Sequence, residues 1–242
     1  MEQSTKNVSS NIADRVVERI SGAPSCAEPF PYLYLEDVFS SEFYTEMLEQ
    51  IPSRDAYRRI ADTGRAGNAY EQRLILNLKA LDALPTAQRQ FWQNLAGWFL
   101  GSEFASALIG KFHRTLAEAI GKDLRQLHYG AEGMLVKDLD GYQIGPHTDL
   151  KSRAISIMFY LPADNRHERH GTSLYIPRDP SFRSDGSRHF EFDAFEKVAT
   201  MPYKANAMFG FPRTTASFHG VEPIREAGIE RDVLLYILRW GD

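Results

Sequence analysis

Hydrophobic positions in the first half of the chain recur mainly at helical spacing. Residues 12–20 carry an apolar stripe after a mainly polar N-terminal stretch, 1–10, which predicts a short amphipathic helix behind an N-terminal tail. Ser40 can cap a second helix that ends before Pro52. The apolar pattern of 86–120, interrupted near Gly101, predicts two further helices in succession.

Two stretches of this half alternate like strands instead, at 31–39 and 72–78. Between them, residues 53–70 contain Gly64, Gly67 and many charged side chains, which predicts a long loop. Such a loop can be a functional lid or a plain surface segment, and the sequence leaves its role open.

The pattern changes from about residue 124. Short apolar runs separated by Gly, Pro, Asp and Asn are typical of a many-stranded sandwich or barrel. The sequence therefore predicts a single α+β domain, in which 1–25 form a tail and short helix, 26–123 mainly helical support, and 124–242 the β-rich core. The runs are LRQLHY, GMLVKDL, AISIMFYLP, TSLYIP, AMFGF, SFHGVEPI and DVLLYILRW.

Composition narrows the class of protein. The 242 residues are 43% hydrophobic, enough for one sizeable core, and the net charge of −4 with scattered Lys and Arg offers no footprint for a nucleic acid. The single cysteine, Cys26, permits no intramolecular disulfide. Without a secretory signal or an apolar stretch long enough to cross a membrane, we expect a cytoplasmic protein with no membrane partner.

Three candidate metal ligands lie next to predicted strands, two of them just before the apolar run AISIMFYLP. His147 and Asp149 are two residues apart, so on an extended segment they point to the same side. His219 follows another apolar run, where antiparallel pairing can bring it beside them. Each residue alone is more often a capped turn or a core histidine. Together, two His and one carboxylate leave coordination positions open, as in non-haem Fe(II) oxygenases.

A cationic anchor completes this hypothesis. A 2-oxo acid that chelates the iron needs a partner for its far carboxylate, and Arg231, twelve residues after His219, begins a strand that can lie beside it. The alternative for Arg231 is a surface ion pair with Glu222 or Glu230. Tyr160 can add a hydroxyl to the same carboxylate or serve as strand packing.

The order of these motifs resembles that of the Fe(II)/2-oxoglutarate-dependent dioxygenases, in particular the prolyl 4-hydroxylase-like branch. The match covers about 124–240 and consists of H-x-D, a strand ending in Tyr-Leu-Pro, Gly-Thr-Ser-Leu, His-Gly-Val-Glu-Pro-Ile and Arg. The resemblance implies a double-stranded β-helix, also called a jelly-roll or cupin-like core, flanked by N-terminal helices.

The resemblance also implies roles for individual residues. The iron ligands would be the three residues above, and Arg231 and Tyr160 would bind the C5 carboxylate of 2-oxoglutarate. Arg153 matches a position that faces the substrate in relatives. Lys137 stands where relatives often carry Tyr, so the local contact to co-substrate or substrate must differ, and Lys137 is a candidate for that contact. For both Arg153 and Lys137 the alternative is a solvated surface position. Val233 replaces a common Ser or Thr, which leaves Tyr160 as the hydroxyl donor.

The activity implied is hydroxylation of an unactivated C–H bond, with release of succinate and CO2. Asp149 is retained where related halogenases lack the carboxylate, which favours hydroxylation over halogenation. Cofactors would be Fe(II), 2-oxoglutarate and dioxygen, with ascorbate as a candidate reductant. The expected substrate is a small molecule such as an amino acid, a sugar or a natural-product intermediate.

Three alternatives stay open. A peptidyl-prolyl hydroxylase would share every motif. A cupin-like zinc or manganese enzyme would use the same ligands but would not need Arg231, and a non-catalytic jelly-roll would bind carbohydrate or peptide. A second histidine motif, HERH at 167–170, lacks the helical offset of zinc sites and is read as loop.

Overall fold

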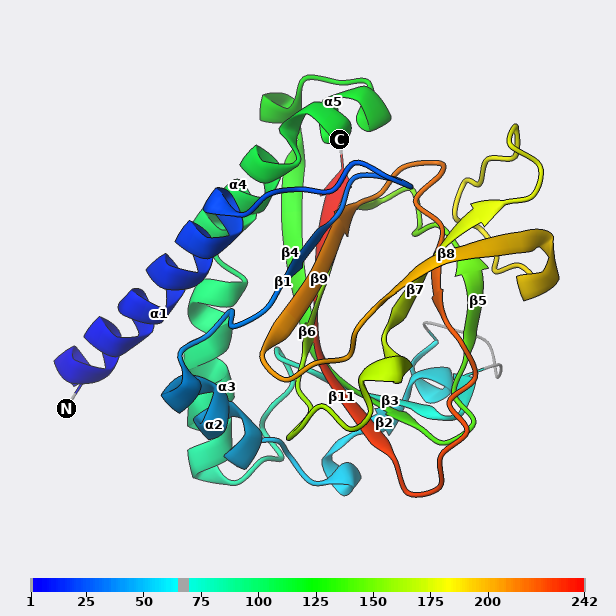
Figure 1. Cartoon of the computed structure of the whole chain (residues 1–242). Helices are drawn as coiled ribbons and strands as arrows, with labels where there is room; N and C mark the ends of the chain where they lie inside the picture. Colours follow the sequence, from blue (N-terminus) through cyan, green and yellow to red (C-terminus); the bar gives the residue numbers. More distant parts are fainter. Residues whose placement is uncertain (1, 65–69, 242) are drawn as a thin grey trace.

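Two antiparallel sheets face each other in a computed structural model of the chain, which describes residues 2–64 and 70–241 (Figure 1). In the described residues the large sheet has the strand order β1-β9-β6-β11-β4-β3-β2, and the small sheet has the order β5-β10-β7-β8. The large sheet consists of β1 (Leu33–Leu35), β2 (Arg58–Arg59), β3 (Arg73–Asn77), β4 (His128–Leu139), β6 (Arg153–Tyr160), β9 (Ala207–Pro212) and β11 (Glu230–Gly241). The small sheet consists of β5 (Ile144–His147), β7 (Thr172–Pro177), β8 (Phe195–Met201) and β10 (His219–Val221).

From β4 onward the chain places successive strands alternately in the two sheets, except at β7 and β8, which are neighbours. The predicted combination of helices with a large antiparallel β core is confirmed. The N-terminal half contributes more than helical support, because β1, β2 and β3 extend the large sheet at both edges. Both strand candidates, 31–39 and 72–78, contain strands of this sheet.

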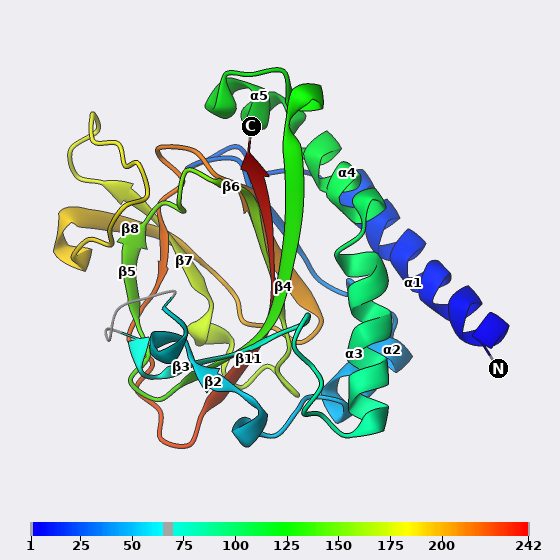
Figure 2. The same cartoon turned by 180° about the vertical axis from the view of Figure 1, so that it is seen from behind.

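Helices cover the outer face of the large sheet (Figure 2). They are α1 (Glu2–Gly22), α2 (Ser41–Glu49), α3 (Thr86–Phe99), α4 (Ser102–Lys111) and α5 (His113–Ile120). The helix α1 packs against α3 and α4, and the indole of Trp92 on α3 donates a 2.7 Å hydrogen bond to the carbonyl of Gln50 after α2. Ser40 caps α2 as predicted, by accepting from the Phe43 amide.

Two helical predictions were wrong in extent. The first helix begins at Glu2 and includes most of the predicted tail, since no Gly or Pro interrupts these residues. The second part of 86–120 divides at Phe112 into α4 and α5. Of the predicted 53–70 loop, residues 65–69 lie outside the described part, and the rest contains β2 and two 3-10 turns.

The central strands of the large sheet are buried on both faces, which explains the continuous apolar runs within β6 and β11. Alternate residues of β11 point to opposite sides: Leu234, Tyr236 and Leu238 pack under the helices, whereas Val233 and Ile237 belong to the cluster between the sheets. No helix among the described residues has the length and apolar character needed to cross a membrane.

Candidate active site

His147 and His219 come together on the small sheet. The first ends β5, the second begins β10, and they are direct partners in the antiparallel ladder. Their ring centres lie 4.3 Å apart. Gly220 permits this close approach, since a Cβ there would lie 2.5 Å from the carbonyl oxygen of Ile144.

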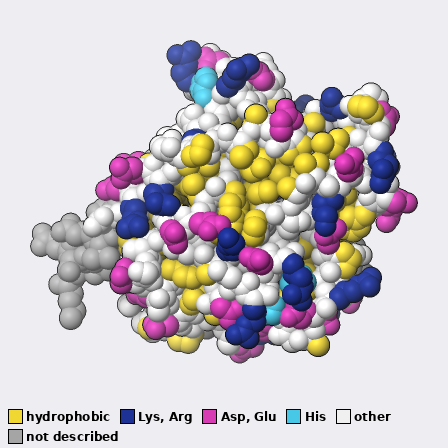
Figure 3. Space-filling view, viewed as in Figure 1, with side chains coloured by type: hydrophobic (Ala, Val, Ile, Leu, Met, Phe, Trp, Pro, Cys, Tyr) yellow, Lys and Arg dark blue, Asp and Glu magenta, His cyan; other side chains and the backbone are white. Residues whose placement is uncertain are grey.

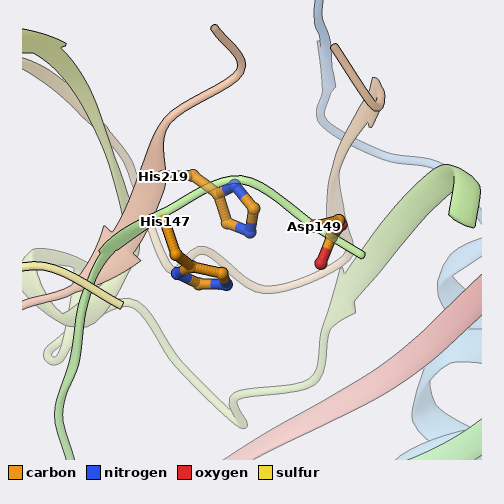
Figure 4. Close-up of side chains that lie close together, drawn as sticks. All are labelled: His147, Asp149 and His219. Carbon is orange, nitrogen blue, oxygen red and sulfur yellow. The ribbon is translucent and has the colours of Figure 1, made fainter. Parts of the chain in front are cut away.

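Asp149 follows β5 and faces the two imidazole rings (Figure 4). One ligand atom from each of the three residues lies within 4.8 Å of the others, and all three residues are buried. The structure therefore brings together the three predicted ligands, although His219 lies 72 residues after His147 in the sequence.

Hydrogen bonds fix the tautomer of both histidines. Nδ1 of His147 lies 2.9 Å from the Gly145 carbonyl, and Nδ1 of His219 lies 3.0 Å from the Ser217 carbonyl. Because a carbonyl only accepts, Nδ1 carries the proton in each ring and Nε2 keeps its lone pair. Burial lowers the pKa of both imidazoles, so they stay neutral, the form that binds metals.

The carboxylate of Asp149 is held from two sides. Ser156 donates to Oδ2 at 2.6 Å, and Arg153 donates to Oδ1 at 2.5 Å. Burial alone would raise the pKa of Asp149, but the charge of Arg153, together with the Ser156 hydrogen bond, outweighs burial and holds that pKa well below its usual range. A charged carboxylate and two neutral imidazoles are the donor set of a divalent transition metal.

A cavity of about 640 Å³ between the sheets contains this cluster. Its long wall is the inner face of β11, with Arg231 near one end, Arg239 near the other, and Val233, Leu235 and Ile237 between them. A cavity of this volume suits a small ligand.

Arg231 lies almost fully buried in the cavity wall. Its Nη1 donates to Asp138 Oδ2 at 2.7 Å, and its Nε donates to the His170 carbonyl at 2.6 Å. Asp138 also accepts two hydrogen bonds from Arg73, at 2.6 and 2.8 Å. Two guanidinium groups thus share one carboxylate, and the cluster keeps one net positive charge beside the cavity.

Tyr160 lies beside this cluster. Its hydroxyl donates to Thr172 Oγ1 at 3.0 Å, and Thr172 lines the cavity. The ring of Tyr160 packs against the Arg231 guanidinium, 5.5 Å from ring centre to Cζ. Tyr160 is thus in place to orient Arg231 and Thr172, whereas its predicted direct contact with a co-substrate stays a prediction.

Lys137 lies on the other face of β4 from the cavity, where its ammonium bonds Glu230 and Asp232 at 2.8 Å each. Strand parity accounts for this: Val136 and Asp138 point inward, so Lys137 points outward. The expectation that it contacts co-substrate or substrate needs correction. Arg153, by contrast, lines the cavity.

Sequence reasoning missed His189, Tyr70 and Arg73, all of which line the cavity. The ring of His189 lies 4.3 Å from that of His147, and its Nδ1 bonds the Tyr70 hydroxyl. No motif marks His189 or Tyr70, because the conformation of the loops decides whether they reach the site. Arg73 had a detectable signal, because it lies within the strand predicted at 72–78.

Cations and anions are interspersed on the molecular face shown in Figure 3. Dark blue and magenta side chains alternate around apolar patches, without a field of one sign on that face.

Comparisons with known proteins bear on the fold. No family model matches the chain, and no curated protein matches its sequence. Solved structures do match. The alpha-ketoglutarate-dependent epimerase SnoN from nogalamycin biosynthesis is 12% identical, with a TM-score of 0.52 over 94% of this chain and 80% of that one. The carbocyclase SnoK is 14% identical, with a TM-score of 0.51 over 86% and 79%.

A prolyl-4-hydroxylase from Pseudomonas putida is 17% identical and matches over 94% of this chain and 98% of that one, with a TM-score of 0.49. At these sequence identities, the structural similarity to SnoN and SnoK shows the fold and does not show the activity. The chain therefore has the fold of the 2-oxoglutarate-dependent Fe(II) oxygenases, as its sequence resemblance implied.

Proposed function

We propose that this protein is a non-haem Fe(II)/2-oxoglutarate-dependent dioxygenase that hydroxylates a C–H bond of a small molecule. One observation carries the proposal: two neutral histidines and one charged carboxylate converge inside a cavity whose wall holds a buried, positively charged arginine cluster. We assign the two sheets as a double-stranded β-helix, in which β9-β6-β11-β4 face β5-β10-β7-β8.

The ligand set fits iron better than structural zinc. Zinc sites of that kind are closed by four protein ligands and favour cysteine, whereas Cys26, the single cysteine, is exposed and is not among the residues that line this cavity. His147, Asp149 and His219 would hold the ion. A ferrous ion with bound 2-oxoglutarate and dioxygen supplies oxidative decarboxylation coupled to C–H oxidation.

The arginine cluster fits the co-substrate. Arg231 has used Nε and one Nη1 proton on protein partners, and its Nη2 makes only a long 3.5 Å contact with Thr172. The remaining donors can bind a carboxylate, and the net positive charge shared with Arg73 and Asp138 favours an anion there.

The protein's own groups position and shield the reaction. Ser156 and Arg153 hold the Asp149 carboxylate, and backbone carbonyls hold both imidazoles in the metal-binding tautomer. Met134, Met158 and Leu235 line the cavity with apolar surface. This surface excludes water from the space between the anchor and the ligands.

Succinate formation tests the proposal. Protein reconstituted with Fe(II) and 2-oxoglutarate in air is expected to form succinate when given a mixed pool of small metabolites. His219→Gln should abolish this, and His128→Gln, which alters an exposed histidine on β4, should leave it unchanged. Turnover supported by zinc without 2-oxoglutarate would instead indicate a cupin-like enzyme. A wild-type protein that binds iron but forms no succinate with any pool contradicts the proposal.

A further inference from the structure

We propose that the substrate is a small molecule with an anionic group, a carboxylate or a phosphate, which Arg153 and Arg239 bind. The inference deepens the proposed function and rests on it, because the metal and the co-substrate are assigned to the other polar groups of the cavity.

The charges around the cavity do not balance. Five arginines line it, namely Arg73, Arg153, Arg188, Arg231 and Arg239, and Asp149 is the one carboxylate among the described lining residues. Two further carboxylates bond these arginines from behind the wall, Asp138 and Glu132.

Binding of metal and co-substrate leaves this imbalance in place. A divalent ion adds two positive charges and 2-oxoglutarate adds two negative charges, so they cancel. Five guanidinium groups then still face three carboxylates. The cavity therefore keeps an excess of two positive charges. Because it is partly shielded from water, this excess favours an anion as the remaining ligand.

The geometry of β11 separates a second anion site from the first. Arg231 and Arg239 are eight residues apart on the same strand face, which at about 3.3 Å per residue is roughly 26 Å between their Cα atoms. Three apolar side chains, those of Val233, Leu235 and Ile237, lie between them. A five-carbon diacid held by Arg231 therefore cannot also occupy Arg239.

Arg153 and Arg239 form a like-charged pair across two strands. They are direct partners in the β6–β11 ladder, and both line the cavity. Like charges in this position destabilise a sheet unless an anion lies between them. Two guanidinium groups side by side match the oxygens of a carboxylate or phosphate.

Each arginine of this pair has unused capacity. Arg153 donates to Asp149, whose charge a bound metal would share, and its buried Nε has no hydrogen-bond partner among the described residues. Arg239 makes longer contacts, at 3.2 Å to Glu132 and 3.4 Å to Ser152.

The neighbouring surface indicates where the rest of the substrate lies. Ile237 is the cross-strand partner of Ser156, which holds Asp149, and the Phe211 ring centre lies 4.4 Å from that of His219. Both side chains line the cavity. An acid bound by Arg239 would therefore lay an apolar body against these residues, next to the candidate metal ligands.

Calorimetric titration of the protein loaded with Mn(II) and 2-oxoglutarate tests the inference. The probes are hexanoate, hexyl phosphate and the uncharged hexanamide. At least one acid is expected to bind about tenfold or more tightly than the amide. The stronger of the two acids identifies the anion as carboxylate or phosphate.

Two substitutions with opposite expected effects separate anion binding from a structural role. Arg239→Gln should remove the preference for the acid, and Arg239→Lys should restore part of it. Glu132→Gln removes a carboxylate that competes for Arg239, so it should strengthen acid binding. If the Arg239–Glu132 pair were only structural, the same substitution would weaken acid binding. Arg114→Gln, on the exposed surface of α5, is the matched control and should change nothing.

The outcomes also distinguish this inference from the proposed function. A separate titration with 2-oxoglutarate should depend on Arg231 and not on Arg239. If 2-oxoglutarate binds in this way but both acids bind no better than hexanamide, the inference alone is overturned. The inference is also overturned if Arg231→Gln loses the preference for the acid and Arg239→Gln keeps it. If 2-oxoglutarate does not bind, both fail.

Discussion

His147 and His219 are partners in the β5–β10 ladder, with their ring centres 4.3 Å apart. The two imidazoles are therefore placed by backbone pairing within a sheet, and each is fixed by a bond from Nδ1 to a carbonyl two residues earlier. A site held by regular structure is rigid, so small changes in the ladder should affect metal binding directly.

Gly220→Ala should weaken metal binding and destabilise the fold. The added Cβ would meet the Ile144 carbonyl at 2.5 Å, and relieving this contact must move β10 away from β5. We expect a loss of about 1–3 kcal/mol in unfolding free energy. We also expect roughly tenfold weaker Mn(II) binding by calorimetry. Gly130→Ala, where a Cβ meets nothing within 4 Å, should change neither.

Metal should stabilise the wild-type protein and not its ligand variants. At a concentration of Mn(II) one hundred times Kd, binding adds about 2.7 kcal/mol, or roughly 5 to 10 °C in Tm for a domain of this size. His147→Gln and His219→Gln should lose this shift in a thermal melt. An equal shift in both variants would place the metal elsewhere.

Arg231→Gln should raise the KM for 2-oxoglutarate by roughly 10- to 150-fold, since charge-assisted hydrogen bonds contribute about 1.5–3 kcal/mol. Arg231→Lys should recover only part of this, because an ammonium cannot replace the guanidinium bonds to Asp138 and the His170 carbonyl. Steady-state succinate kinetics measure both. Arg166→Gln, on the surface, serves as the control. An unchanged KM for 2-oxoglutarate in Arg231→Gln would show that Arg231 does not anchor the co-substrate.

Lys137→Met should lower stability without affecting co-substrate binding. The substitution leaves the carboxylates of Glu230 and Asp232 without their ammonium partner, a loss of about 3 kcal/mol at pH 8. Urea unfolding measures the stability, and calorimetry the affinity for 2-oxoglutarate. A large fall in that affinity would instead indicate that Lys137 contacts the co-substrate, as the sequence suggested.

The effect of Lys137→Met should depend on pH. Burial raises the pKa of Asp232 to about 6, although Lys137 opposes the rise. Between the unfolded value of 3.8 and about 6, the folded wild-type protein binds the extra proton, so this carboxyl favours folding more as pH falls. Without Lys137 the pKa rises further. The destabilisation relative to wild type should therefore be smaller at pH 5 than at pH 8.

The convergence of His147, Asp149 and His219 was predictable from the spacing and order of these residues in the sequence. His147 and Asp149 lie on one side of an extended segment, and His219 and Arg231 follow in an order that resembles the motif order of the Fe(II)/2-oxoglutarate-dependent dioxygenases. Chemistry then limits which side chains can meet. The start of α2 was also predictable, because its N-cap, Ser40, accepts a hydrogen bond from the amide of Phe43, only three residues later.

Strand parity was not predictable where both faces of a strand are buried. In GMLVKDL nothing in the pattern tells whether Lys137 or Asp138 faces the cavity, because helices cover one face and the small sheet the other. Contacts that depend on loop conformation, such as that of His189 with Tyr70, have no periodic signal at all.

The visible spectrum of the anaerobic protein tests the central claim most directly. With Fe(II) and 2-oxoglutarate together, the wild-type protein should develop a weak charge-transfer band. His219→Gln should lack the band, and Arg231→Gln should require a much higher concentration of 2-oxoglutarate to reach it. A wild-type protein that binds iron yet shows no band, or an Arg231→Gln titration identical to wild type, contradicts the account.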